Sequence, residues 1–373
     1  MKILIAADIF PPQAGGPATY AVTLANELVK QGIEVSIVSL NSHSDKKVLD
    51  NRVALFSVKS SFKPLRYWQY YRLLLARGRS ADVIYAMGPV NAGWPAWRAA
   101  RKLRKKFVVK VVGDYAWEQG QVLGLIKDSV DDFQKKSYGG KVGWLKKIEA
   151  NVASVADCVI VPSKYLAGIV KGWGAAENKI EVVYNAIEIP PTVKPMEKPD
   201  VERWVVSAAR LVPWKGMEAV MRAVKDLQRT FSSLKLKIIG DGPDRKRLEQ
   251  IQNELGLMSV VSFFGNVPRA EALSYIAAAD VVILNSGYEG LSHMLLEARF
   301  LGRTAIASRV GGNPEVFSDK FLFPRDDVYA SGECLKNALA HPAEPVSPEF
   351  AARFSFETMI AETKKILEKV CAG

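Results

Sequence analysis

The stretch VVILNSGYEGLSHMLLEA, residues 281–298, changes its hydrophobic pattern part-way along. It opens on a continuous apolar run rich in β-branched side chains, which is typical of a strand buried on both faces of a parallel sheet. From residue 294 onward it has the length and composition of a helix. Gly290 stands between the two segments, so the stretch predicts a strand, a turn and a helix.

The same alternation extends in both directions along the chain. In the second half we expect strands at 204–208, 236–239, 260–264, 281–285 and 304–307, and helices at 215–231, 245–255, 269–279, 294–301 and 356–370. In the first half we expect strands at 2–7, 34–40, 82–87, 107–112, 158–162 and 180–184, and helices at 19–31 and 92–105. Strands separated by helices predict βαβ units and parallel sheets that are covered on both faces.

A cluster of prolines divides the two series, at Pro190, Pro191, Pro195 and Pro199. Prolines mixed with charged residues are typical of an interdomain linker. We therefore expect an α/β protein with two doubly wound, Rossmann-like domains that face each other across a cleft. The domains are expected at 1–189 and 201–353, with a linker at 190–200. Ligands of such sheets bind at the carboxyl ends of the strands.

The composition excludes several classes of protein. The chain has 373 residues, of which 49% are apolar and 24% charged, so it is not a disordered protein. No stretch approaches the roughly 18 uncharged residues of a membrane-spanning helix. The first apolar run ends at Asp8, too early for a signal peptide, and we expect a cytoplasmic protein. The three cysteines and three histidines are scattered, which argues against a disulfide framework and a metal site.

The positive charge is concentrated in the first half. Residues 1–190 contain 27 Lys and Arg against 16 Asp and Glu, whereas the remainder contains 24 against 23. This asymmetry indicates an anionic partner such as a phospholipid membrane, a phosphorylated substrate or nucleic acid. Aromatic and basic residues share the expected helices around 67–74 and 92–105, which suits a membrane surface. Alternatively, the face formed by Tyr67, Tyr70, Tyr71 and Leu74 packs on the sheet and the arginines are solvated.

Two glutamates stand out in the opening stretch. Glu297 lies among apolar residues, where a carboxylate needs a partner, and a pair of ribose hydroxyls would supply one. Glu289 precedes Gly290 at the start of the expected helix, where close backbone approach favours phosphate. Alternatively, Glu289 is a first-turn residue favoured by the helix dipole and Glu297 lies on a solvated face.

Three further loops follow expected strands. In AARLVPWKG, residues 208–216, Arg210 and Lys215 are placed to clamp a diphosphate, although either alone is typical of an ordinary surface. The pair Gly15-Gly16 allows a ligand to approach the backbone, and a structural turn would need the same residues. The loop that begins with Gly240 and Asp241 is, taken alone, a turn.

Together these stretches resemble one family, the retaining glycosyltransferases of family 4, which have two Rossmann-like domains in the GT-B arrangement. The similarity covers essentially the whole chain. It is carried by MKILIAADIFPPQAGGPATY (1–20), NAIE (185–188), ARLVPWKG (209–216), GDGPDRKRLE (240–249), FFGNVP (263–268), YEGLSHMLLEA (288–298) and FSFETMIAETKKILEKV (354–370).

The resemblance implies a function and a set of site residues. It implies transfer of a sugar from a nucleoside-diphosphate donor to a glycan or lipid-linked acceptor, with no metal or other cofactor. Glu289 would contact the donor sugar, Glu297 would hold the ribose, and Arg210 and Lys215 would neutralise the diphosphate. Residues 354–373 would cross back to the first domain. The other donor-binding residues that it implies are Gly15, Gly16, Gly240, Asp241, Gly265, Val267, Gly290, Leu291 and Ser292.

The chain departs from the family at one position. Relatives commonly have a histidine after the fourth strand, near the donor sugar, and here Val112 or Gly113 occupies that place. Asp114 is the nearest polar candidate for a catalytic position that orients the sugar or the acceptor. A strand-end aspartate is as often a helix or turn cap.

The resemblance also favours peripheral binding to the cytoplasmic face of an anionic membrane, because many relatives glycosylate lipid carriers. Two rival functions stay open on the sequence. A nucleotide-sugar 2-epimerase shares the two-domain architecture and would need no acceptor. A basic nucleic-acid-binding protein would fit the charge, but it has no supporting motif and leaves the Arg/Lys–Glu set unexplained. We expect no nucleic-acid partner.

Overall fold

The computed structural model describes residues 1–13, 15–341 and 343–373. These form two compact units: unit 1 comprises Met1–Tyr184 and Glu357–Gly373, and unit 2 comprises Asn185–Phe356. Each unit is an α/β sheet structure, as the sequence predicts. The division after Tyr184 lies earlier than the expected boundary at 189. The expected linker lies against unit 2, where Lys198 forms an ion pair with Asp280 at 2.6 Å.

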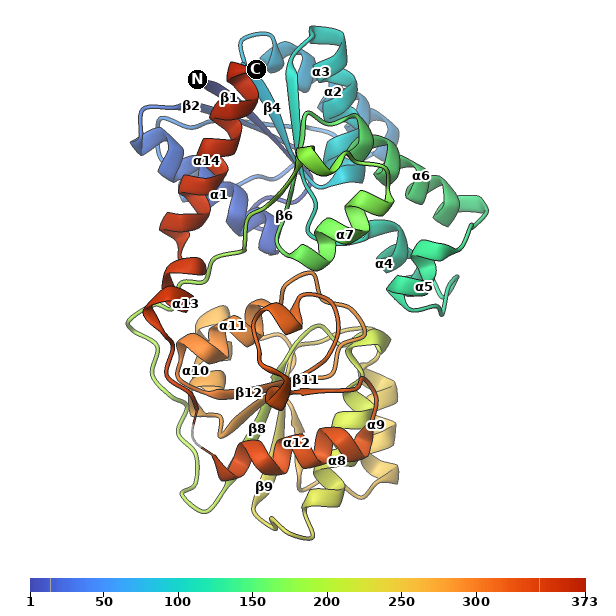
Figure 1. Ribbon diagram of the computed structural model, residues 1–373, viewed down its shortest axis with the longest axis vertical. Coiled ribbons are helices and arrows are strands. Elements are labelled where there is room, and N and C mark those ends of the chain that lie inside the picture. The colour runs from blue at the N-terminus through green and yellow to red at the C-terminus, as the bar shows by residue number, and fades with distance from the viewer. Residues whose placement is uncertain (14, 342) are drawn as a thin grey trace. The chain divides into compact units, whose positions relative to one another are not determined.

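Within the described residues, unit 1 has a seven-stranded parallel sheet in the order β3-β2-β1-β4-β5-β6-β7. The residues of β4 and β6 are all buried, because helices cover both faces of the sheet (Figure 1). The strand order reverses between β1 and β4. The strands are β1 (Lys2–Ala7), β2 (Glu34–Ser39), β3 (Ala54–Ser57), β4 (Val83–Met87), β5 (Lys106–Lys110), β6 (Cys158–Val161) and β7 (Ile180–Val182).

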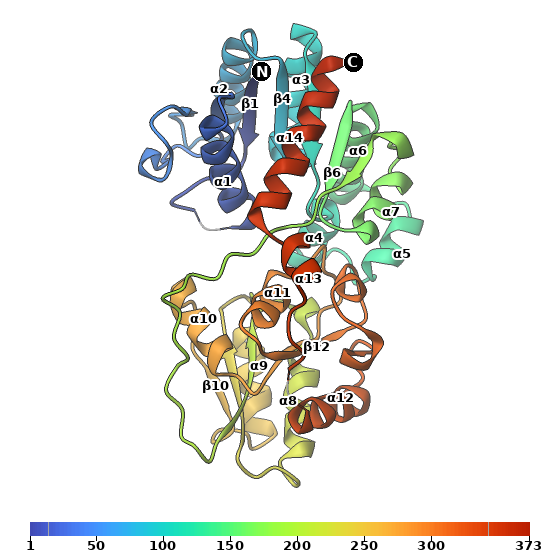
Figure 2. The same ribbon diagram turned by 60° about the vertical axis from the view of Figure 1, so that its left-hand side comes forward.

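The last helix of the chain belongs to unit 1. Helix α14 lies beside α1 in both ribbon views, and the Tyr20 hydroxyl of α1 is 3.1 Å from the Thr363 hydroxyl of α14 (Figures 1 and 2). Helix α14 therefore completes the cover over one face of the sheet. The helices of unit 1 are α1 (Gly16–Lys30), η1 (Lys46–Val48), α2 (Lys63–Gly78), η2 (Pro89–Gly93), α3 (Trp94–Leu103), α4 (Tyr115–Val122), α5 (Val130–Lys135), α6 (Gly140–Val155), α7 (Lys164–Gly172), η3 (Glu177–Lys179) and α14 (Phe356–Ala372).

Unit 2, within the described residues, has a six-stranded parallel sheet in the order β10-β9-β8-β11-β12-β13. Its order reverses between β8 and β11, and Val205, Ile238 and Ile283 of the central strands are fully buried in one core. The strands are β8 (Arg203–Ala208), β9 (Leu234–Ile239), β10 (Val261–Phe263), β11 (Val281–Leu284), β12 (Thr304–Ser308) and β13 (Leu322–Phe323).

Helices flank both faces of the unit 2 sheet as well. Helix α12 lies beside α8 on one face, and Leu335 of α12 is buried in the same core as Met221 of α8. The helices are η4 (Pro213–Lys215), α8 (Met217–Leu227), α9 (Arg245–Glu254), α10 (Arg269–Ala278), α11 (His293–Phe300), η5 (Asn313–Glu315), η6 (Asp319–Phe321), α12 (Val328–Ala340) and α13 (Pro348–Arg353).

The aromatic face predicted on α2 packs inward. Tyr70 and Leu74 are fully buried, and Tyr67 and Tyr71 are half-buried. The alternative that this face covers the sheet is therefore correct for Tyr70 and Leu74, and the expectation that it meets a membrane is wrong for these two residues. Burial of two large side chains is worth about 1.5–3 kcal/mol each, which explains the outcome.

Candidate active site

Loops from three strands meet at the carboxyl edge of the unit 2 sheet. The Gly240 amide, after β9, donates to the Gly265 carbonyl, after β10, at 2.8 Å. The Leu211 amide, after β8, donates to the Asp241 carbonyl at 3.0 Å. The predicted residues Gly240, Asp241 and Gly265 therefore lie against the loop that carries Arg210.

Two glycines of the GDGP loop are required by close backbone packing. Gly240 has a φ of +119°, and a Cβ there would lie 2.1 Å from the carbonyl oxygen of Ala209. A Cβ at Gly242 would lie 2.1 Å from the carbonyl oxygen of Leu211. The two glycines thus allow the backbones of the two loops to pack closely. This packing fixes the backbone conformation around Arg210.

An ion pair joins two of the predicted catalytic residues. The Nζ atom of Lys215, at the end of η4, donates to Oε1 of Glu289 in the loop after β11. The hydroxyl of Ser286 donates to the same oxygen at 2.5 Å. The side chains of Lys215 and Glu289 are only 18% and 12% exposed, so water screens this pair less than it screens surface pairs.

The backbone next to Lys215 is fixed by close packing of Gly216 against Asn285. Gly216 has a φ of +55°, and a Cβ there would lie 2.4 Å from the Asn285 carbonyl oxygen. The buried Asn285 side chain donates to the Gly216 carbonyl at 2.9 Å and to the Asp326 carboxylate at 3.0 Å. These contacts fix the backbone from which the Lys215 side chain extends.

Glu289 is held in a similar way. The Gly312 amide donates to its carbonyl at 3.0 Å, and a Cβ at Gly311 would lie 1.9 Å from that carbonyl oxygen. Helix α11 begins only at His293, so Glu289 lies in the loop before the helix. The alternative of a first-turn glutamate favoured by the helix dipole is therefore wrong.

The residues between Glu289 and α11 have mixed environments. Gly290 is half-buried, and Leu291 and Ser292 are 5% and 7% exposed. The Ser292 hydroxyl accepts the Leu295 amide hydrogen at 3.4 Å and caps α11. The helix expected from residue 294 thus begins at His293, and Ser292 has a structural function as its cap.

Arg210 is the exposed cation of the site. It lies in the loop between β8 and η4. This is the loop that leads to Lys215, and α8 begins at Met217, seven residues after Arg210. Its guanidinium forms no ion pair with any residue in the described parts of the chain. An exposed cation on a loop that packing holds in place is available to an anionic ligand.

Glu297 has a partner that the sequence does not predict. It lies on α11 with a side chain that is 14% exposed, and Nη2 of Arg269 donates to its Oε1 at 3.1 Å. Burial raises the pKa of Glu297, and Arg269 partly offsets the shift. The alternative of a solvated face is wrong, because the carboxylate is largely buried. Arg269 also donates to the Glu188 carbonyl at 3.0 Å, which fixes its guanidinium.

The other residues predicted near the donor sit at the ends of β9 and β10. The Asp241 carboxylate accepts the Gly242 amide hydrogen at 2.7 Å and lies 3.6 Å from the Arg245 guanidinium. Val267 is half-buried, two residues after Gly265. The backbone bridge between Gly240 and Gly265 places these two loops side by side.

Asp114 in unit 1 is a helix cap. It is fully buried, and its carboxylate accepts the Trp117 amide hydrogen and an Nε2 hydrogen of Gln134, each at 2.7 Å. The expectation that Asp114 orients the sugar or the acceptor is corrected here, because a fully buried carboxylate with these partners presents no oxygen to a ligand. The cap alternative accounts for it.

A second buried carboxyl lies beneath the same helix. Glu149 of α6 accepts the amide hydrogens of Tyr115 and Ala116 at 2.7 and 3.1 Å. Burial, together with the neighbouring Asp114 charge, raises the pKa of Glu149 well above its usual range. Burial also raises the pKa of Asp114. Two carboxyls thus satisfy the first amides of α4, which would otherwise lack partners.

The remaining predicted positions lie at the carboxyl edge of the unit 1 sheet. Gly15 and Gly16 stand at the start of α1, and the φ of 164° at Gly15 is extended backbone that any residue can adopt. A Cβ at Gly15 would meet its nearest atom at 3.6 Å, an ordinary contact. Val112 and Gly113, where relatives have histidine, line a cavity of about 410 Å³.

The described residues contain neither a cluster of metal-ligating side chains nor a helix that could span a membrane. No group of three or more His, Cys, Asp and Glu side chains among them is arranged to hold a metal ion. None of their helices combines the length and apolarity needed to cross a membrane.

Two family models together match most of the chain. Residues 14–189 match glycosyltransferase family 4, and residues 190–353 match the glycosyl transferases of group 1. The chain is a family 4 glycosyltransferase. The enzyme class that the sequence predicts is thereby confirmed.

Comparison with individual proteins supports the same conclusion. The glycosyltransferase is 28% identical to the lipopolysaccharide core biosynthesis glycosyltransferase LpsD of Rhizobium meliloti over 309 residues, which span 80% of the chain and 76% of LpsD. Its fold is similar to that of sucrose-phosphate synthase from Thermosynechococcus elongatus, with a TM-score of 0.80, 19% identity and coverage of 100% and 99%. HepE of Anabaena, solved in complex with UDP, gives a TM-score of 0.73 at 19% identity, with coverage of 99% and 100%. The fold is of the GT-B type.

Several residues that build the site of this glycosyltransferase were missed from the sequence. Asn285 and Ser286 directly follow a strand, and a polar pair at a strand end was a usable signal. Arg269 and Gly311 gave no such signal, because their partners lie 28 and 22 positions away in the chain.

Proposed function

We propose that this glycosyltransferase moves a sugar from a nucleoside-diphosphate donor to a glycan or lipid-linked acceptor of the cell envelope. We further propose that it retains the anomeric configuration and requires no metal ion. One observation carries the proposal: a shielded Lys215–Glu289 pair lies at the carboxyl edge of the unit 2 sheet, and Lys215 shares its loop with an exposed Arg210. UDP in the similar HepE and the lipopolysaccharide core assigned to LpsD support this donor class and acceptor class.

The charges suit departure of a diphosphate. When the bond between the anomeric carbon and the phosphate oxygen breaks, negative charge accumulates on the leaving group. Arg210 and Lys215 are the cations that would stabilise it, and their loop is already fixed by Gly216 and Asn285. Such preorganised contacts do not need to reorganise during the reaction.

The two glutamates have separate functions in this proposal. Glu289 holds the Lys215 ammonium in place and faces the donor sugar. Glu297 accepts hydrogen bonds from the ribose hydroxyls, because a carboxylate has more lone pairs than its bond with Arg269 uses. Arg269 keeps Glu297 oriented and limits the rise of its pKa.

The donor can be identified by thermal shift. UDP-, GDP- and ADP-sugars are added to the whole chain, and a ligand that binds only the native state raises Tm. We expect one nucleotide series to raise Tm, and we expect this shift to be absent in Arg210→Ala. Proton NMR of the product formed from that donor then reports the anomeric configuration, with and without EDTA. An inverted product, or activity abolished by EDTA and restored by a divalent cation, would contradict the corresponding part of the proposal.

We also propose that unit 1 binds an anionic membrane through an α2–α3 surface, defined by Leu65, Trp68 and Arg72 of α2 with Arg98 and Arg101 of α3. Leu65 and Trp68 are 42% and 57% exposed, although the opposite face of α2 is buried. Arg72 lies over the Trp68 ring at 5.4 Å, and Arg101 lies over the Trp97 ring at 5.8 Å.

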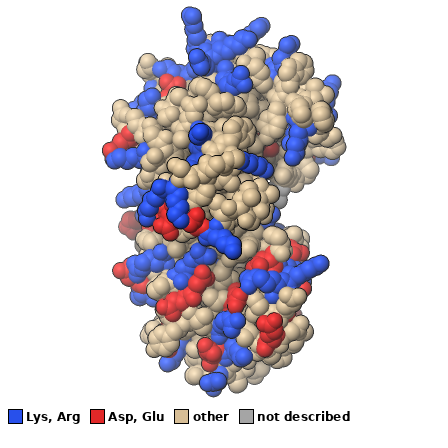
Figure 3. Space-filling view, turned by 90° about the vertical axis from the view of Figure 1, so that its right-hand side faces the viewer, with Lys and Arg blue, Asp and Glu red and all other residues tan. Residues whose placement is uncertain are grey.

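The charge of this region favours anionic lipid. From residue 51 to residue 113 the chain has 14 Lys and Arg and one acidic residue, Asp82. Figure 3 shows basic side chains crowding the upper part of unit 1 on the face in view. Basic residues near a surface of anionic lipid contribute about 1 kcal/mol each, and exposed aromatics insert at the headgroup level.

Liposome sedimentation tests the α2–α3 surface. The wild-type protein should bind vesicles that contain phosphatidylglycerol more strongly than neutral vesicles, and binding should weaken with salt. Trp68→Ser should reduce binding, whereas Trp144→Ser on α6, a tryptophan of similar exposure at 59%, should not. Equal binding of both vesicle types at low salt would refute the proposal.

A further inference from the structure

Both donors to the Glu289 carboxylate bind the same oxygen atom. The Lys215 ammonium and the Ser286 hydroxyl each donate to Oε1. A carboxylate oxygen has about two lone-pair sites, so these two bonds use the capacity of Oε1. Among the residues that the structure describes, Oε2 has no hydrogen-bond or ion-pair partner, and it is not one of their buried unpartnered atoms. Oε2 is therefore open to solvent or to a ligand.

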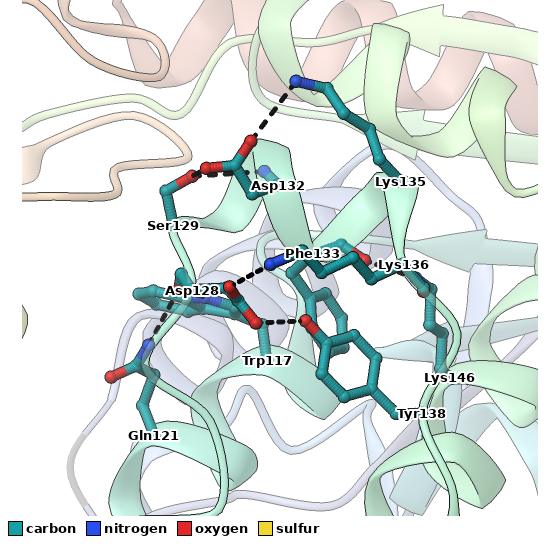
Figure 4. A network of polar contacts seen from close by, with 10 residues as sticks. All are labelled: Trp117, Gln121, Asp128, Ser129, Asp132, Phe133, Lys135, Lys136, Tyr138 and Lys146. Carbon is teal, nitrogen blue, oxygen red and sulfur yellow. Dashed lines mark hydrogen bonds and ion pairs between the residues drawn. The ribbon is translucent and has the colours of Figure 1, made fainter.

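Acidic residues of unit 1 show a different pattern. Figure 4 shows Asp132, which accepts the Ser129 hydroxyl at Oδ2 and the Lys135 ammonium at Oδ1, at 2.8 and 3.3 Å. Asp128 in the same network also divides its two donors, a lysine and a tyrosine, between its two oxygens. A carboxylate, a hydroxyl and an ammonium thus do not by themselves direct both donors to one oxygen. The arrangement at Glu289 needs a local cause.

The cause is the fixed backbone of Ser286. Its carbonyl accepts the Ser308 hydroxyl of β12 at 2.7 Å, and the next amide, that of Gly287, donates to the Trp214 carbonyl of η4 at 2.6 Å. Ser286 and Ser308 are both fully buried. A serine hydroxyl on a fixed backbone has three staggered positions, so it can donate in few directions. Ser286 therefore defines where Oε1 lies.

The loop after β12 supports this arrangement from beneath. Asn313 is fully buried, and its Nδ2 donates to the Ser308 carbonyl at 2.9 Å. The preceding residue, Gly312, donates its amide hydrogen to the Glu289 carbonyl at 3.0 Å. One loop thus holds the backbone of Glu289 and, through Ser308, the backbone of Ser286. The carboxylate and its hydroxyl donor keep a constant spacing for this reason.

The ammonium alone would not select one oxygen. The last side-chain torsion of a glutamate is broad and roughly two-fold, so either oxygen can face Lys215 at similar cost. The second donor, Ser286, removes this freedom. An open carboxylate oxygen attracts a hydroxyl and repels a phosphate oxygen. Because the proposed function places the phosphates at Arg210 and Lys215, a hydroxyl of the donor sugar is the group that suits Oε2.

We propose that Ser286 is a positioning residue for the transfer reaction. Its hydroxyl holds the Glu289 carboxylate with Oε1 on the Lys215 ammonium, so that Oε2 accepts a hydrogen bond from a hydroxyl of the donor sugar. Ser308 and Asn313 keep Ser286 in place. The identity of the sugar ligand rests on the proposed function, whereas the coupling between Ser286 and Glu289 does not.

Steady-state kinetics of the whole chain, with the donor found by thermal shift, test this proposal. Ser286→Ala should lower kcat about ten- to hundredfold, as expected for loss of a hydrogen bond to a charged group. It should not change the Tm shift that the nucleoside diphosphate alone produces, because no phosphate contacts Oε2. Ser286→Thr keeps the hydroxyl and should recover most of the lost activity.

Ser129→Ala is the matched control. It removes the same kind of bond from Asp132, whose side chain is 54% exposed and also pairs with a lysine. It should leave kcat and the Tm shift with nucleoside diphosphate unchanged. Unchanged kcat in Ser286→Ala would overturn the proposal. Loss of the diphosphate shift in Ser286→Ala would overturn it as well, because Ser286 would then support the whole donor site.

A double-mutant cycle shows whether Ser286 acts through Glu289. In the Glu289→Ala background, which lacks the acceptor, Ser286→Ala should lower kcat much less than it does in the wild-type protein. The two substitutions should also be non-additive in the free energy of unfolding, measured in urea. Additive effects in both measurements would refute the positioning function, even in a protein that turns over its donor normally.

The urea cycle needs no donor, so it separates this proposal from the proposed function. Non-additive unfolding in a protein whose Tm no nucleotide sugar raises would refute the proposed function and, with it, the sugar ligand of Oε2. The coupling of Ser286 to Glu289 would stand in that case. Additive unfolding and additive kcat in a protein that binds a nucleotide sugar would refute the coupling and leave the proposed function intact.

Discussion

Acidic residues that follow strands differ in burial and in bonding partners between the two sheets of the molecule. After β11 of unit 2, Glu289 lies in a loop and pairs with Lys215, and its side chain keeps 12% of its surface exposed. After β5 of unit 1, Asp114 is fully buried and caps α4, with Glu149 beneath it. An acidic residue after a strand therefore does not reveal its function by position. A neighbouring cation on a loop that also carries an exposed arginine indicates a binding site, whereas a fully buried carboxylate that caps a helix indicates a structural residue.

The largest expected effect comes from removing the Lys215–Glu289 ion pair of unit 2. Lys215→Ala should lower kcat/KM by about 10²–10³, because loss of one preorganised contact to developing charge costs about 2.7–4 kcal/mol. The fold should be retained, but Tm should fall, because the shielded Glu289 carboxylate loses its ion-pair partner. Lys225→Ala, an exposed lysine of α8, is the matched control and should leave kcat/KM unchanged. Near-normal kcat/KM in Lys215→Ala would remove this residue from the mechanism.

The corresponding change in unit 1 should affect stability instead. Glu149→Ala leaves two α4 amides without their acceptor and should lower the free energy of unfolding by about 2 kcal/mol or more. Urea unfolding followed by circular dichroism measures the change. Glu177→Ala, whose side chain is 78% exposed, should have no measurable effect. An equally small loss in both variants would show that the α4 cap does not depend on Glu149.

A third change tests whether tight backbone packing holds Glu289. Gly311 and Gly256 have φ values of +57° and +68°, but only at Gly311 would a Cβ collide, at 1.9 Å from the Glu289 carbonyl oxygen. Gly256→Ala should cost about 1–2 kcal/mol from left-handed strain alone. Gly311→Ala should cost more stability and also lower kcat/KM. Equal effects on both quantities would show that Glu289 does not depend on this contact.

The smallest effect, when measured over a single pH unit, concerns Lys110 in unit 1. Burial lowers the pKa of Lys110 to about 7, and its Nζ lies 4.1 Å from the centre of the Tyr20 ring. The groups on the same face, Tyr20, Tyr85 and Cys158, have pKa values raised by burial and stay neutral below pH 10.

Between about pH 7 and the usual lysine pKa of about 10.4 the unfolded chain therefore binds one more proton than the native state. Stability should rise with pH in this window, by at most about 1.4 kcal/mol per unit. Lys110→Met should flatten that slope in urea titrations at several pH values. A slope that persists in the variant would assign it to another group.

The sequence predicted much of this molecule because parallel strands buried on both faces are continuous apolar runs. The run at residues 2–7 is β1 itself, and most other expected strands differ from the observed ones by one or two residues at their ends. The strand Ala54–Ser57 was missed because it is a short, partly exposed edge strand. The strand Leu322–Phe323 was missed because two residues show no period.

The site was predicted less completely. Residue types and positions made Arg210, Lys215, Glu289 and Glu297 candidates, and the resemblance to family 4 supplied the functions expected of them. Their partners depend on which strands are neighbours, and the Lys215–Glu289 pair joins residues 74 positions apart in the chain. The burial of Asp114 could not be foreseen for a related reason, because it depends on α6 supplying Glu149 from 34 positions beyond Tyr115.

The membership of α14 in unit 1 has a consequence for biosynthesis. Residues 357–373 leave the ribosome after the whole of unit 2, so the buried face around Tyr20 and Tyr85 has no Thr363 to bind until unit 2 has been synthesised. Domains generally fold in the order of their synthesis. Here we expect the order to be reversed, with unit 2 maturing first and unit 1 exposed to chaperones and proteases until its final helix arrives.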